Sequence, residues 1–168
     1  RVASGSPKGH DLSLAVKAGA RLIFAGWNAE PSIGLDWYRL YREGFLETGA
    51  GAASLDIADA TQDLVLPSVG IRLSQSFDIG SFVVSPELRA RYYRNVGDLN
   101  STITAALAGA GNTPFTVTGA GLSRDIGVLG MGLTAQQGEN LSLFAHYDAV
   151  LAKDVTAHTF AAGLKITW

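Results

Sequence analysis

The last thirteen residues of this 168-residue chain alternate strictly between two kinds of side chain. One face carries Phe160, Ala162, Leu164, Ile166 and Trp168. The other carries Thr159, Ala161, Gly163, Lys165 and Thr167. A period of two predicts a β-strand with one apolar and one polar face. A strand that ends on an aromatic residue is typical of the closing strand of an outer-membrane barrel, because aromatic residues there lie at the membrane interface.

The same alternation recurs along the chain and predicts six further strands, at 10–24, 27–43, 62–77, 81–96, 121–136 and 141–152. The first of these segments covers about 15 residues, whereas strands of soluble proteins usually have about 5–6. A strand of that length can cross a bilayer while tilted. No segment predicts a helix, so we expect an all-β protein.

The predicted connections differ in length. Those near residues 26, 79 and 138 are short, and 44–60 and 97–119 read as long loops. The connection at 153 is short but lies on the long-loop side. Short turns at one end and long loops at the other are typical of bacterial outer-membrane barrels, whose short turns are periplasmic. We therefore expect an antiparallel up-and-down transmembrane β-barrel, or the C-terminal portion of one, forming a single domain over 1–168. Bacterial single-chain barrels have even strand counts, so seven strands predict that the N-terminal part is incomplete.

The composition fits this class and excludes several others. Hydrophobic residues make up 47% of the chain and charged residues 17%, against a usual charged share of about 25%. The net charge of −2 gives no basis for nucleic-acid binding. Cysteine is absent, which excludes disulfide scaffolds and thiol nucleophiles. No apolar run approaches the ~18 residues of a membrane helix.

Charged side chains occupy the polar faces of the predicted strands. We expect these to face the lumen of the barrel: Lys17, Arg21, Asp36, Arg72, Glu87, Arg89, Arg91, Asp148 and Lys165. Such a face can be a hydrophilic pore that lets a polypeptide segment pass, or a network that fills and stiffens the lumen. The two interpretations are compatible.

Aromatic residues gather near the predicted strand ends. We expect a set of interfacial aromatics consisting of Trp27, Trp37, Phe77, Phe82, Tyr92 and Tyr147. The alternative is that large aromatics fill the core of a soluble sandwich, but the polar faces carry too much charge for a sandwich interior.

The sequence gives little basis for catalysis or for a cofactor. His10, His146 and His158 lack the spacing of a metal site. No Gly-x-Ser-x-Gly elbow occurs. Glu87 with Asp36 or Asp148 is the one carboxylate set that could polarise an amide for self-cleavage. We expect no enzyme, no metal and no cofactor.

Several short motifs, in this order and spacing, resemble the C-terminal translocator (β-) domain of type V autotransporters. They are Ile33-Gly34-Leu35-Asp36-Trp37, Gly44-Phe45-Leu46-Glu47-Thr48-Gly49, Val69-Gly70-Ile71-Arg72-Leu73-Ser74, Ser85-Pro86-Glu87-Leu88-Arg89-Ala90, Pro114-Phe115-Thr116-Val117, Ser123-Arg124-Asp125, Gly130-Met131-Gly132-Leu133 and Gly163-Leu164-Lys165-Ile166-Thr167-Trp168. The resemblance covers nearly the whole chain and corresponds to the last seven or so strands of the family's barrel.

The resemblance implies a domain in the outer membrane of a Gram-negative bacterium that supports export of an N-terminal passenger through type V secretion. Its implied partners are the lipid bilayer, the barrel assembly machinery, and the chain's own passenger and linker helix. The family's assembly signal maps onto Gly163, Ile166 and Trp168, although Ala161 departs from the polar residue expected upstream.

Other functions remain open from the sequence. The alternative is a small outer-membrane barrel that serves as a structural anchor or adhesin through its outer loops. An outer-membrane hydrolase would need acidic residues and histidines clustered at the outer rim, where only Asp154 and His158 qualify. A soluble lipocalin-like barrel would direct its apolar face inward around a ligand.

Overall fold

The computed structural model describes residues 2–111 and 113–168. The long strands and their continuations are β1 (Gly9–Gly19), β2 (Leu22–Phe24), β3 (Trp27–Arg42), β6 (Ala60–Ser74), β7 (Phe77–Ile79), β8 (Phe82–Arg94), β11 (Asp125–Gln137), β12 (Leu141–Ala152) and β13 (Val155–Ile166). The shorter elements are β4 (Phe45–Leu46), the 3₁₀ turn η1 (Gly51–Ala53), β5 (Leu55–Ile57), β9 (Thr102–Leu107) and β10 (Pro114–Thr118). No helix among the described residues is long and apolar enough to cross a membrane.

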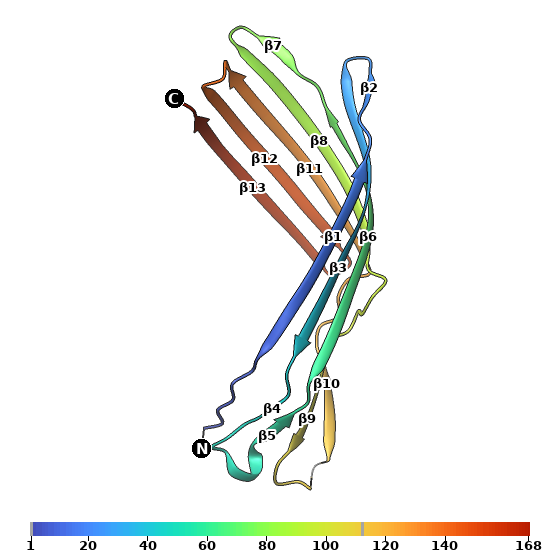
Figure 1. The fold of residues 1–168 in the computed structure, drawn as a ribbon, viewed down its shortest axis with the longest axis vertical. Helices are drawn as coiled ribbons and strands as arrows, with labels where there is room; N and C mark the ends of the chain where they lie inside the picture. The colour runs from blue at the N-terminus through green and yellow to red at the C-terminus, as the bar shows by residue number, and fades with distance from the viewer. Residues whose placement is uncertain (1, 112) are drawn as a thin grey trace. The chain divides into compact units, whose positions relative to one another are not determined.

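The long strands form one sheet in the order β1-β3-β6-β8-β11-β12-β13, with β2 paired to β3 and β7 to β8. Each strand thus lies beside the long strand that follows it along the chain, and β8, β11, β12 and β13 run side by side in Figure 1. Antiparallel ladders join β6 to β8, β8 to β11, β11 to β12 and β12 to β13. The predicted all-β, up-and-down topology with seven long strands is confirmed.

Contacts divide the chain into two units. The loop-side unit contains residues 1–15, 36–66 and 95–122. The turn-side unit contains residues 16–35, 67–94 and 123–168, and includes the predicted short turns.

The short turns of the turn-side unit use the backbone conformations that tight hairpins require. Phe24 pairs with Trp27, so the loop contains only Ala25 and Gly26, with φ of 50° and 82°. Positive φ at both central residues defines a type I′ turn, which matches the twist of the adjoining strands. Gly80 opens the next two-residue turn, between the paired Ile79 and Phe82, with φ of 62°.

The segments predicted as long loops contain strands of their own in the loop-side unit. They form a four-stranded sheet in the order β10-β9-β5-β4. Ala50, Ser54, Ala105 and Ala106 are each less than one-tenth exposed in this unit, and Asn95 is 1% exposed. These strands cover only two to six residues each, fewer than the ~9–11 residues of a membrane-crossing strand, so the long alternating runs of the sequence do not include them.

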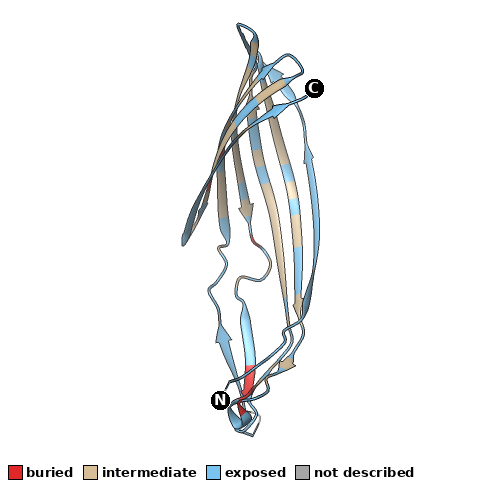
Figure 2. Ribbon diagram, turned by 90° about the vertical axis from the view of Figure 1, so that its left-hand side faces the viewer, coloured by how far each residue is buried: buried red, intermediate tan, exposed pale blue. Residues whose placement is uncertain are grey.

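Large apolar side chains are exposed rather than buried. The buried apolar residues in the described part of the chain are the four alanines Ala50, Ala105, Ala106 and Ala149, and Figure 2 shows how little of the ribbon is buried. By contrast, Phe160 is 71% exposed, Leu164 62% and Ile33 65%. A water-soluble domain of this size buries its leucines and phenylalanines in a core, so this surface requires an apolar environment.

Candidate functional site

A continuous series of ion pairs crosses the polar face of the turn-side unit. We call it the charge ladder, and it contains Arg21, Glu30, Arg72, Glu87, Arg89 and Asp148. Arg21 precedes β2, Glu30 lies on β3 and Arg72 on β6; Glu87 and Arg89 lie on β8, and Asp148 on β12. Side chains from five strands or their ends are thus linked.

The first half of the charge ladder is centred on Glu30. Arg21 donates through Nε to Glu30 Oε1 at 2.9 Å, and Arg72 donates through Nη1 to Glu30 Oε2 at 3.2 Å. One carboxylate therefore joins two guanidinium groups. Glu30 was not among the residues predicted to face the lumen, although its place two residues before Ser32 on the polar face of the same strand could have indicated it.

The second half is centred on Glu87, whose side chain is only 13% exposed. Arg72 donates through Nε to Glu87 Oε2 at 2.6 Å, and Arg89 Nε lies 3.4 Å from Glu87 Oε1. Arg89 Nη2 also donates to Asp148 Oδ1 at 2.9 Å. Glu87 and Asp148 thus share Arg89 between them.

A glycine makes the contact between Arg89 and Asp148 possible. These residues lie on β8 and β12, and β11 runs between the two strands. Gly130 of β11 stands in register with both Arg89 and Asp148. A Cβ atom at Gly130 would collide with Asp148 Oδ1 and lie 2.9 Å from Arg89 Nε. The absent side chain therefore leaves the space in which the ion pair forms.

Two more glycines of this face receive a large side chain from the neighbouring strand. A Cβ atom would lie 2.6 Å from His146 Nδ1 at Gly132, and 2.6 Å from Phe144 Cζ at Gly163. The ring of Phe144 in turn lies 5.5 Å from that of His146. Gly163, predicted as part of an assembly signal, thus also has a packing role.

Arg91 is held differently from the arginines of the ladder. Its Nη1 donates to Ser68 Oγ at 3.0 Å and its Nη2 to Ser32 Oγ at 2.6 Å. The guanidinium carbon lies 5.9 Å from the centre of the Tyr93 ring. Hydroxyl groups orient this guanidinium without neutralising its charge.

The ladder borders a hollow of about 820 Å³ within the turn-side unit. Its lining includes Lys17, Arg21, Arg72, Arg89, Arg91, Glu30 and Asp148. Seven of the nine predicted polar residues therefore belong to the ladder, the hollow or both. The other two lie elsewhere: Asp36 is in the loop-side unit, and Lys165 is paired in register with Ser142 on β12.

Three of the predicted interfacial aromatics form hydrogen bonds with a neighbouring strand. Trp37 Nε1 donates to Asp63 Oδ1 at 3.2 Å, the Tyr92 hydroxyl bonds with Asp125, and the Tyr147 hydroxyl lies 2.7 Å from His158 Nδ1. These polar partners could not be predicted from the alternation, because it predicts which face a residue lies on but not the register between strands.

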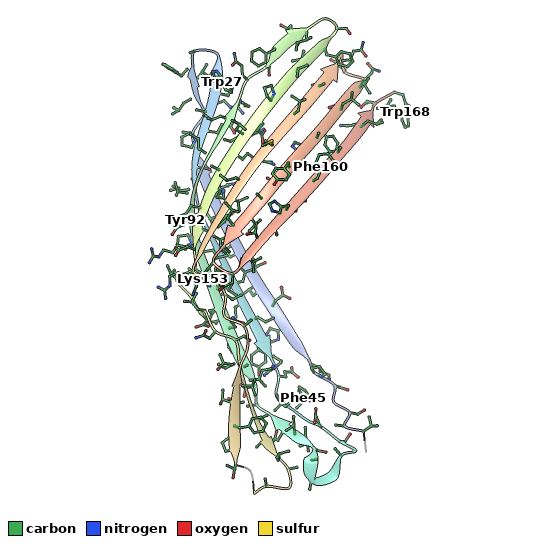
Figure 3. All side chains as sticks on the ribbon, turned by 180° about the vertical axis from the view of Figure 1, so that it is seen from behind. Trp27, Phe45, Tyr92, Lys153, Phe160 and Trp168 are labelled. Carbon is green, nitrogen blue, oxygen red and sulfur yellow. The ribbon has the colours of Figure 1, made fainter. Side chains whose placement is uncertain are left out.

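The remaining aromatics lie near the short turns. Trp27 pairs with Phe24, Phe77 with Val84 and Phe82 with Ile79. Trp27 and Trp168 lie toward the turn end of the unit in Figure 3, while Tyr92 lies at the other end of its strand. Trp168 is fully exposed, and Ile166 pairs with Leu141.

No group of three or more side chains suited to holding a metal ion occurs within 2–111 and 113–168. An antiparallel sheet with a charged face, exposed apolar side chains and short turns at one end defines the class of outer-membrane β-barrel proteins.

The comparisons with known proteins agree with this class. The family model for the autotransporter β-domain matches residues 1–148. The chain therefore belongs to the autotransporter β-domain family. A search of curated proteins found no match.

Membership of this family establishes an outer-membrane translocator domain of a Gram-negative bacterium, in the type V secretion class. The family inserts in the outer membrane and carries a passenger domain, and it is a transport family rather than an enzyme family.

Proposed function

We propose that the charge ladder forms the wall of a hydrophilic pore through which the passenger reaches the cell surface. The observation that carries this proposal is the run of ion pairs from Arg21 to Asp148 across one face of the sheet. On that face, Gly130 leaves the space in which Arg89 and Asp148 meet. Charged groups are tolerated at membrane depth where they are paired and face water. A wall of this kind offers a passing polypeptide no continuous apolar surface on which to adhere.

The proposal is tested by changing the polarity of the wall while retaining its shape. In the full-length protein, the double variant Arg72→Leu with Glu87→Leu makes the centre of the ladder apolar. The matched control, Arg72→Gln with Glu87→Gln, removes the charges but keeps hydrogen-bonding groups. Passenger at the surface is measured by protease accessibility in intact cells, and folding of the barrel by heat-modifiable gel migration.

We expect the leucine pair to reduce surface passenger several-fold while the barrel remains folded, and the glutamine pair to retain most of it. Wild-type levels of passenger on a folded leucine variant would contradict a role for the polar wall in export.

We also propose that the barrel assembly machinery reads the closing strand through Trp168 and Ile166. Trp168 is fully exposed, and an exposed aromatic side chain is available to a partner. Trp168→Ala should lower the yield of assembled barrel in cells but leave refolding of the purified protein in detergent unchanged. An equal loss in both assays would assign Trp168 to stability instead.

A second candidate function is a surface anchor or adhesin that acts through the outer connections. The sheet β10-β9-β5-β4 favours it, because these connections are structured rather than irregular. Deleting residues 101–119 removes β9 and β10. Loss of cell adhesion with normal passenger export would support this second function, and unchanged adhesion would dismiss it.

A further inference from the structure

The charges that line the hollow of the turn-side unit do not balance. Its lining holds the cations Lys17, Arg21, Arg72, Arg89 and Arg91 and the carboxylates Glu30 and Asp148. Three of these arginines, Arg21, Arg72 and Arg89, have a carboxylate partner. Within 2–111 and 113–168, neither Lys17 nor Arg91 forms an ion pair, so two positive charges remain without a neutralising partner.

The guanidinium of Arg91 is fixed in place before any ligand arrives. The hydroxyls of Ser32 and Ser68 accept one hydrogen bond each from different terminal nitrogens, at 2.6 and 3.0 Å. A guanidinium has five N–H donors, so the two hydrogen bonds to serine leave further donors of Arg91 available to a ligand. Since these side chains are partly buried, an uncompensated charge there has fewer waters to solvate it and favours a carboxylate.

We propose that Arg91 and Lys17 form a binding site for an acidic side chain, Asp or Glu, on the passenger-linked segment of this protein as that segment passes the charge ladder. This inference rests on the proposed function. Charge complementarity selects the occupant: the unpaired charges are both positive, and the carboxylates of the hollow are already engaged by Arg21, Arg72 and Arg89. A basic segment would be repelled at the same place.

The site gives the passing segment a preferred position at one level of the wall. A carboxylate that meets both Arg91 and Lys17 gains two charge-assisted contacts, while the neighbouring ladder remains paired. The charge ladder thus forms the neutral lining of the wall, and Arg91 with Lys17 binds the carboxylate of the passing segment.

Lys17 provides the sharper test, because in the described part of the chain its side chain forms neither an ion pair nor a hydrogen bond, whereas Arg91 donates to Ser32 and Ser68. In the full-length protein, Lys17 is changed to Arg, Gln and Glu, and the half-time for the passenger to reach the surface is followed by pulse labelling and protease accessibility. We expect no change for Lys17→Arg, slowing of about two- to fivefold for Lys17→Gln from the loss of one exposed pair, and about tenfold for Lys17→Glu, which adds repulsion.

A control cation of the same unit lies outside the hollow. Lys153 is in the turn between β12 and β13, so Lys153→Glu should leave the half-time unchanged. Arg91→Lys should retain most of the wild-type rate, and Arg91→Gln should slow export. Heat-modifiable migration shows that each variant is folded; if Arg91→Gln is not, the Lys17 series decides alone.

The outcomes separate this inference from the proposed function. Equal half-times across the folded Lys17 variants, with normal export in the wild type, would overturn the acidic-segment site and leave the pore intact. A folded wild-type barrel that presents no passenger would overturn the proposed function itself. A half-time that is unchanged for Lys17→Arg, longer for Lys17→Gln and longest for Lys17→Glu would support both the acidic-segment site and the proposed pore.

Discussion

Gly130 shows how one residue without a side chain organises the charged face. It lies between Arg89 and Asp148 in the two ladders that flank β11, so the pair can meet across the intervening strand. The sequence alone could predict that Arg89 and Asp148 share a face, because both occupy polar positions of alternating strands. It could not predict their contact, since that depends on the register of three strands and alternation says nothing about register.

Gly130→Ala should therefore destabilise the domain. Its Cβ atom would collide with Asp148 Oδ1 and crowd Arg89, and overpacking of this kind costs about 1–3 kcal/mol. Gly127→Ala on the same strand is the matched control, because a Cβ there lies 3.8 Å from its nearest neighbour, an ordinary contact. Urea unfolding of the refolded full-length protein measures both. Equal effects of the two substitutions would mean that the space above Gly130 is not needed.

Ala25 carries strain that the sequence does not reveal. It is the one non-glycine residue with positive φ in the described part of the chain, at 50°. A left-handed conformation costs an L-residue roughly 1–2 kcal/mol, so Ala25→Gly should raise the free energy of unfolding by about 1 kcal/mol. Ala18→Gly, inside β1 and without positive φ, should lower it by about 0.5–1 kcal/mol. Unfolding midpoints that shift in the same direction for both would contradict the type I′ assignment.

At the scale of the strands, the alternating pattern was sufficient to predict all seven long strands. Residues 141–152 were predicted with the bounds that β12 has in the structure, and the run predicted at 10–24 is interrupted between Gly19 and Leu22. The strands inside the long connections were missed because each covers only two to six residues. In β10, for example, Phe115 and Val117 alternate with threonines, but over only five residues, fewer than the ~9–11 residues of a membrane-crossing strand.

The two faces of β11 should respond differently to a new charge. Leu133 is 48% exposed on the apolar face, and Thr134 is the next residue, on the face of Gly130 and Gly132. Leu133→Arg should cost about 2–4 kcal/mol in a bilayer if it lies near the midplane. Thr134→Arg should cost far less, because its side chain meets water. Refolding into lipid vesicles with urea titration measures the difference, and equal costs would argue against a lipid-facing surface.

The protein as a whole reverses the usual distribution of side chains, with large apolar side chains on the surface and charged ones on the opposite face of the sheet. Low charge and alternating strands predicted this reversal, and the exposure of Phe160, Leu164 and Ile33 is its structural counterpart. The sequence could not show which charges pair and which do not. That distinction separates the neutral ladder from the unpaired Lys17 and Arg91, and it required the positions of Ser32 and Ser68 as well.

The most direct test is to measure what each face of β11 contacts. Nitroxide labels are placed singly at Leu129 and Leu133, and at Val128 and Thr134, in the full-length protein reconstituted in lipid vesicles. Collision with oxygen reports lipid, and collision with a water-soluble nickel chelate reports water. We predict that oxygen dominates at Leu129 and Leu133 and the nickel chelate at Val128 and Thr134. Equal access of the chelate to all four sites would contradict the claim that one face lies against lipid and the other lines an aqueous path.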